Sequence, residues 1–158
     1  MSENTLPNAV VPDANILIAL CTKEDLTFQV AEKAFDKYVQ DGCEFFAPNI
    51  IVAEVLYVLC GKLAQGILTA SEHEKAVEFF TDYMSAVSLP ENGESSLIKR
   101  AEEIRETYGC SRASDSLYIA LAEELTKTRP TELLTFDKGF VNQAAKNAPT
   151  VQINLLTI

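Results

Sequence analysis

The sequence predicts a single-domain α/β protein in which helices cover both faces of a parallel sheet. Short apolar segments alternate along the chain with longer segments of helical periodicity. Strands interleaved with helices in this way are typical of a parallel sheet. The 158 residues suffice for one domain with a substantial core, and no repeat or linker divides them. We expect residues 1–8 to be a loose N-terminal segment and residues 9–158 to form the domain.

The first elements follow from local patterns. The segment VVPDANILIAL begins as a buried strand that ends at Asp13 and continues as an apolar helix. Residues 26–40 carry apolar side chains three and four positions apart, which predicts an amphipathic helix. A short strand is expected at residues 44–47, and Pro48 then suits the first turn of another helix.

The remaining elements alternate in the same way. Ser71 and Glu74 have the spacing of a capping box at a helix start, and SAVSLP predicts a short strand after that helix. A helix is expected in ESSLIKRAEEIRETYG, closed by Gly109. Another is expected from about Ser114, as the N-cap, to Thr126. ELLTF and TVQINLL predict the last two strands.

Composition excludes several classes of function. The apolar runs are far shorter than the ~20 residues of a transmembrane helix. The N-terminus lacks the basic and apolar regions of a secretory signal, so we expect a cytoplasmic protein. The four cysteines form no Cys-x-x-Cys pair, the chain has one histidine, and glycine-rich phosphate loops are absent. These observations argue against metal–thiolate, histidine-based and P-loop chemistry.

The charge of the chain is strongly acidic. The net charge of −10, from 13 basic and 23 acidic residues, argues against nucleic-acid binding unless bound cations reverse the local field. Six of the 13 basic residues lie within one 31-residue stretch, which leaves a local cationic surface open. These six are Lys99, Arg100, Arg105, Arg112, Lys127 and Arg129.

Four acidic residues are candidates for a shared site. Asp13 and Asp137 each follow a predicted strand, where parallel sheets bind ligands. Asp115 opens a predicted helix, and Glu54 lies inside the apolar segment NIIVAEVLYVL, where an acid is costly unless a cation or a donor meets it. Carboxylates gathered in a small cavity need positive charge, and Mg²⁺ prefers oxygen ligands. Such a site can carry out metal-assisted hydrolysis.

Two neutral side chains lie beside these acids in the sequence. Asn15 and Thr135 are candidates to hold waters or to orient a carboxylate.

Each acid also has an ordinary structural explanation. Asp13 is explained equally as a turn residue or N-cap, and Asp137 as the cap of the last helix. Asp115 is explained as a favourable first-turn charge, and Glu54 as an acid at a partly exposed helix edge. The residues alone therefore leave both explanations open.

Four segments, in order, resemble the successive motifs of the PIN domain in its compact bacterial form, typified by VapC toxins. They are VPDANILIAL, IIVAEVLYVL, ASDSLYIALAEEL and ELLTFDKGF, and the resemblance extends from about residue 10 to residue 153. It implies a three-layer α/β/α fold with a central, mostly parallel sheet, and a Mg²⁺- or Mn²⁺-dependent ribonuclease. By resemblance, Asp13, Glu54 and Asp115 bind the principal ion. Asp137 would support a second ion or its waters.

The resemblance also implies partners. VapC-type toxins cleave structured RNA such as transfer or ribosomal RNA, commonly form homodimers, and are held inactive by a cognate antitoxin. Arg112 and Lys138 are candidate phosphate contacts near the expected site, with ordinary surface charge as the alternative. The alternative function is a non-catalytic PIN-fold module that binds RNA or protein, which the acidic net charge favours.

Overall fold

The computed structural model describes residues 6–110 and 113–158. Strands and helices alternate along the chain as the sequence predicts. The elements are β1 (Ala9–Pro12), α1 (Ala14–Thr22), α2 (Asp25–Gln40), β2 (Glu44–Phe45), α3 (Ile50–Ala64), α4 (Ala70–Ala86), the 3₁₀ helix η1 (Glu94–Leu97), α5 (Ile98–Glu106), α6 (Ala113–Thr126), β3 (Thr131–Thr135), α7 (Lys138–Asn147) and β4 (Gln152–Leu155). Of the segment 1–8 that we expect to be loose, only residues 6–8 are described, and they are exposed.

The strands form one parallel sheet with the order β2-β1-β3-β4. The two central strands, β1 and β3, pair from Ala9 opposite Thr131 to Pro12 opposite Leu134. Every residue of β1 is buried, because helices cover both faces of the sheet. Since β1 and β3 are parallel neighbours, the residues that follow them meet at one edge of the sheet.

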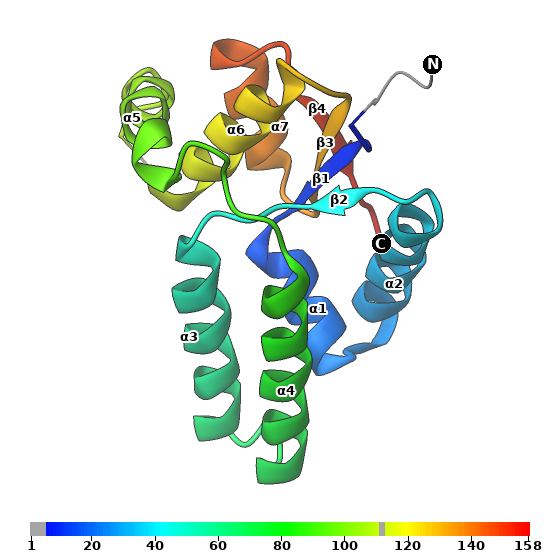
Figure 1. Ribbon diagram of the computed structural model, residues 1–158. Coiled ribbons are helices and arrows are strands. Elements are labelled where there is room, and N and C mark those ends of the chain that lie inside the picture. Colours follow the sequence, from blue (N-terminus) through cyan, green and yellow to red (C-terminus); the bar gives the residue numbers. More distant parts are fainter. Residues whose placement is uncertain (1–5, 111–112) are drawn as a thin grey trace.

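Helices lie on both sides of the sheet, as Figure 1 shows. On one side α6 packs on β1 and β3, α7 packs on β4, and α5 lies against α6. On the other side lie α1 and α2, while α3 and α4 run side by side against α1 and extend away from the sheet. The three-layer α/β/α fold expected from the sequence is confirmed. None of the described helices is both long enough and apolar enough to span a membrane.

The core follows the apolar periodicity of the helices. Ile51, Val55 and Leu59 lie four residues apart on α3 and are fully buried. Tyr118 and Leu121 of α6 are buried as well, as their positions in the predicted stripe require. Each large apolar side chain buried in this way stabilises the fold by about 1.5–3 kcal/mol before the loss of conformational entropy is counted.

The capping box of α4 lies two residues earlier than predicted. The Thr69 hydroxyl accepts a hydrogen bond from the backbone N–H of Glu72 at 3.1 Å, and the Glu72 carboxylate accepts one from the backbone N–H of Thr69 at 2.7 Å. The sequence contains two overlapping Ser/Thr-x-x-Glu patterns, and the chain enters the helix at the first. Ser71 and Glu74 therefore lie inside α4, and their prediction as the capping box is wrong.

Four other local predictions need correction. Helix α3 begins at Ile50 with Asn49 as its N-cap, so Pro48 lies before the helix and not in its first turn. The helix expected in ESSLIKRAEEIRETYG starts as the 3₁₀ turn η1 and becomes α-helical only at Ile98. The segment SAVSLP does not form the predicted strand. It makes an isolated β-bridge, between Ser88 and Phe46. Helix α6 begins at Ala113, so Ser114 lies within its first turn and is not the N-cap.

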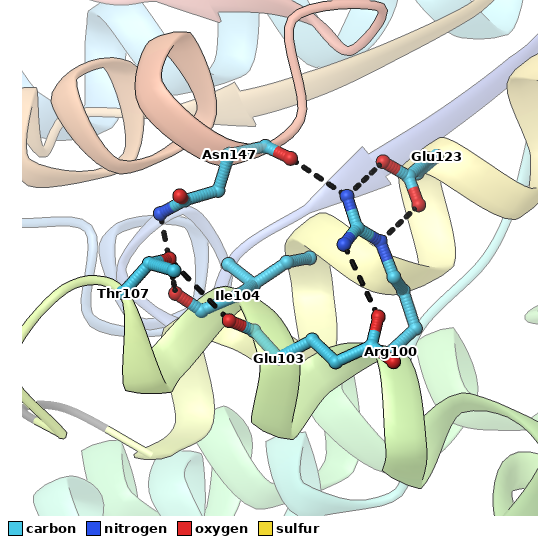
Figure 2. A network of polar contacts seen from close by, with 6 residues as sticks. All are labelled: Arg100, Glu103, Ile104, Thr107, Glu123 and Asn147. Atoms are coloured by element: carbon cyan, nitrogen blue, oxygen red, sulfur yellow. Dashed lines mark hydrogen bonds and ion pairs between the residues drawn. The ribbon is translucent and has the colours of Figure 1, made fainter.

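Hydrogen bonds from one arginine connect helices α5, α6 and α7, as Figure 2 shows. Arg100 of α5 donates from Nε and Nη2 to the Glu123 carboxylate of α6, at 2.7 and 2.9 Å. Its Nη2 also donates to the backbone carbonyl of Asn147 at the end of α7, at 2.6 Å. The Asn147 side chain in turn donates to the carbonyl of Ile104 on α5 at 3.2 Å. Arg100 thus fixes α5 against α6 and α7, the two helices that pack on this face of the sheet.

Candidate active site

Asp13 lies at the carboxyl end of the central strand β1 and is 2% exposed. Its backbone N–H donates to the carbonyl of Leu134 on β3 at 3.0 Å, which extends the sheet pairing beyond β1. Oδ1 accepts a hydrogen bond from the backbone N–H of Ile16 at 3.1 Å and caps α1. Oδ2 accepts one from the Thr135 hydroxyl at 2.5 Å. Asp13 is therefore both an N-cap and a buried acid held by neutral donors.

The electrostatic surroundings of Asp13 disfavour its ionised form. Burial raises the pKa of Asp13 from 3.8 to about 7. The hydrogen bonds from Thr135 and Ile16 lower this pKa, while the negative charges of Asp115 and Asp137 raise it. Asp115 and Asp137 therefore both lie within electrostatic reach of Asp13. An N-cap needs neither such burial nor acidic neighbours.

Thr135, the last residue of β3, links two of these acids. Its hydroxyl donates to Asp13 and accepts a hydrogen bond from the backbone N–H of Asp137 at 3.0 Å. Oδ1 of Asp137 accepts one from the backbone N–H of Gly139 at 2.7 Å and caps α7. Because Thr135 is fully buried, its hydroxyl fixes Asp13 relative to the backbone that carries Asp137.

Glu54 lies half-buried on α3 and meets a hydroxyl from α6. Tyr118, 1% exposed, donates from its hydroxyl to Oε1 of Glu54 at 2.9 Å. Burial raises the pKa of Tyr118, and the charges of Glu54 and Asp13 raise it further, so the hydroxyl keeps its proton. This is the donor that an acid in so apolar a segment requires. The sequence identified Tyr118 only as a core residue, and no local signal pairs positions 64 residues apart.

The other candidates lie around these acids or outside the described chain. Asp115 is half-buried in the first turn of α6. Asn15, on the exposed side of α1, lines a groove of about 570 Å³ together with Asp137 and Lys138. Arg112 lies outside the described residues.

The donor set suits a hard divalent cation in its chemistry, since all four acids offer oxygen ligands. Across residues 6–110 and 113–158, no group of three or more Asp, Glu, His or Cys side chains is arranged so that it could hold a metal ion. The structure does contain a buried carboxylate whose pKa is raised partly by acidic neighbours. A cation bound there would favour its ionised form.

Most of the clustered basic residues are engaged by acids. Four of the six contact carboxylates, and these acids partly offset the positive charge of the stretch. The ion pairs are Arg100 with Glu123 and Glu103, Arg105 with Glu102, Lys127 with Glu124, and Arg129 with Glu44.

Comparison with known proteins identifies one family. The family model described as PIN domain matches residues 10–146, a range that contains all four candidate acids. A comparison with curated protein sequences finds no match.

Proposed function

The chain belongs to the PIN domain family, whose members are generally nucleases, and we propose that it is a divalent-metal-dependent endoribonuclease. The observation that carries the proposal is the state of Asp13. This carboxylate is buried at the carboxyl end of a central strand, and its pKa is raised to about 7 by burial and by the charges of Asp115 and Asp137. Such a position is unfavourable for folding alone and favourable for binding a cation.

In this proposal the four acids have different roles in binding the metal ions. Asp13, Glu54 and Asp115 would hold the principal ion, and Asp137 would hold a second ion or its waters. Mg²⁺ or Mn²⁺, when bound, supplies Lewis-acid stabilisation of the negative charge that develops during phosphodiester hydrolysis. Thr135 keeps Asp13 in a fixed orientation through its hydrogen bond.

The lining of the groove beside Asp137 is an argument for RNA as the substrate. Lys138 lines it, is exposed, and forms no ion pair with any described residue, so its ammonium is free to contact a phosphate. The half-buried Phe136 also lines this groove and offers a ring to an unstacked base. Lys138→Gln is expected to weaken RNA binding and to reduce the dependence on salt by about one phosphate contact.

Cleavage assays test the proposal directly. Purified protein is incubated with structured RNA and either Mn²⁺ or a chelator, and the products are resolved on denaturing gels. We expect cleavage only with Mn²⁺, and we expect Asp13→Asn and Glu54→Gln to abolish it. Glu78→Gln, which removes an exposed acid from α4, is the matched control and should cleave normally. Undiminished cleavage in both site variants would overturn the assignment of the site.

We further propose that the chain is the toxin of a toxin–antitoxin pair and acts as a cytoplasmic homodimer. The order of the VapC-like segments supports the toxin role. An apolar exposed face on α3 supports an interface between copies, since Val52 and Leu56 are partly exposed and Tyr57 is 82% exposed. Induced expression should arrest growth, and Asp13→Asn should relieve the arrest. Light scattering should give a dimer mass that Tyr57→Glu reduces.

The alternative is a PIN-fold module that binds RNA or protein without turnover. The net charge of −10 and the pairing of most clustered basic residues disfavour contact with RNA phosphates, so they favour the form of this module that binds protein. Calorimetric titration with Mn²⁺ separates the two functions. A nuclease of the proposed kind must bind the ion, whereas absence of binding together with absence of cleavage would favour the module.

A further inference from the structure

We propose that Tyr118 is a positioning residue that holds the Glu54 carboxylate in place for the divalent cation. The inference rests on the proposed function. The observation behind it is the hydrogen bond of 2.9 Å from the Tyr118 hydroxyl on α6 to Oε1 of Glu54 on α3. A residue that orients a metal ligand from behind acts through that ligand and does not touch the ion.

Tyr118 is itself rigidly held. It is 1% exposed, and its ring packs edge-on against Phe140 of α7, with centroids 6.0 Å apart and planes at 76°. It follows Asp115 by three positions on α6, which puts both side chains on the same side of that helix. Phe140 follows Asp137 by three positions. The ring therefore connects the three helices that carry or follow Glu54, Asp115 and Asp137.

The hydroxyl orients Glu54 without neutralising it. Only Oε1 is engaged, and Oε2 makes no hydrogen bond within the described residues. The negative charge of Glu54 thus remains available to a cation. An arginine would have cancelled it, as Arg100 does for Glu123.

Burial alone does not dictate such a partner. Tyr83 is also buried, at 9% exposure, and its hydroxyl has no hydrogen-bond partner among the described residues. Two tyrosines of the same core thus differ in whether the hydroxyl meets a carboxylate. Tyr83 therefore supplies the matched control.

The first test is the affinity for Mn²⁺. Tyr118→Phe removes one oxygen and keeps the ring against Phe140. Calorimetry should show Mn²⁺ binding about tenfold weaker than in the wild type, as expected for loss of a group that orients a metal ligand. Under saturating Mn²⁺, kcat for RNA should fall while KM stays unchanged, because the substrate groove is intact. Tyr83→Phe should match the wild type in both measurements.

The second test needs neither metal nor activity. In protein labelled with ¹³C at the glutamate carboxyl carbon, the Glu54 signal is assigned by its loss in Glu54→Gln. That signal should shift in metal-free Tyr118→Phe and stay in place in Tyr83→Phe. If Tyr118→Phe fails to fold, Phe140→Leu keeps the hydroxyl but loosens the ring, and it should weaken Mn²⁺ binding relative to the wild type.

The outcomes separate this inference from the proposed function. If the wild type binds Mn²⁺ and cleaves RNA while Tyr118→Phe equals it in affinity and kcat, the positioning role is overturned and the nuclease stands. Equal weakening by Tyr83→Phe would also overturn it, because the effect would then be one of core packing. A wild type that neither binds Mn²⁺ nor cleaves RNA would overturn both.

Discussion

Two acidic regions of this molecule differ in the donors that their carboxylates meet: a charged arginine in one region and neutral groups in the other. Where α5, α6 and α7 meet, Glu123 receives two N–H groups from Arg100, and this pairing raises the pKa of Arg100 (Figure 2). At the carboxyl edge of the sheet, Asp13 and Glu54 accept hydrogen bonds from three neutral donors among the described residues, namely Thr135, Ile16 and Tyr118.

The difference separates a structural role for Glu123 from the functional role that we propose for Asp13 and Glu54. At the first region the chain supplies its own cation, so the acid is satisfied when folding is complete. At the second region the pKa of Asp13 is raised to about 7, so ionising this acid works against folding. A buried acid with a raised pKa is expected at a functional site, here one where a cation from solution would bind to the carboxylate.

The largest expected effect is a pH-dependent decrease in the free energy of unfolding, caused by the ionisation of Asp13. The unfolded chain ionises this residue above its ordinary pKa of 3.8, whereas the folded protein keeps it protonated up to about 7. The free energy of unfolding therefore falls as the pH rises through this interval, because the folded state binds more protons. At about 1.4 kcal/mol per pKa unit, the cost above pH 7 is on the order of 4 kcal/mol.

Asp13→Asn should remove this cost. Asparagine does not ionise and remains a good N-cap. Without metal, the variant should be more stable than the wild type by about 2–4 kcal/mol at pH 8, and equally stable at pH 4. Urea unfolding at both pH values measures this. A wild type no less stable than Asp13→Asn at pH 8 would contradict the raised pKa.

Adding the divalent cation that we propose for this site should have the next largest effect. Mn²⁺ at 100 times its dissociation constant should raise the free energy of unfolding of the wild type by about 2.7 kcal/mol. Asp13→Asn should gain much less, because it has lost a ligand. Thermal unfolding with and without Mn²⁺ at pH 8 checks this, and equal gains in both proteins would show that the ion binds elsewhere.

At the other region, the cation belongs to the chain and its removal should destabilise. Arg100→Met leaves the partly buried Glu123 and the carbonyl of Asn147 without their donor. Because Arg100 is 38% exposed, solvent screens part of the loss, and we expect about 2 kcal/mol of destabilisation in urea unfolding. Lys127→Met breaks an exposed pair with Glu124 and should change nothing measurable. RNA cleavage should persist in Arg100→Met at temperatures where it is folded.

The smallest expected effect concerns the neutral donors. Thr135→Val removes the hydroxyl that donates to Asp13, and this should raise the pKa of Asp13 above about 7 by roughly one further unit. Carboxyl ¹³C titration of Asp13 measures the change, and Thr135→Ser should leave the pKa in place. If both variants titrate like the wild type, the hydrogen bond does not control this acid.

The local placement of the acids could be predicted from the sequence because it depends on short-range patterns. Asp13 ends a strand and starts a helix, and Asp137 follows β3 and caps α7, as their flanking residues indicated. The same short-range reasoning failed for Ser71 and Glu74, since two overlapping patterns are equally good and only the path of the backbone selects Thr69.

Periodicity, strand ends and motif order therefore determined the fold class, the helices and the candidate acids of this protein. The tertiary structure alone decided which donor each acid meets. Thr135 reaches Asp13 across 122 residues of sequence, and Tyr118 reaches Glu54 across 64. Such pairs depend on strand register and on the packing of helices from different layers, which bring side chains together irrespective of their separation along the chain.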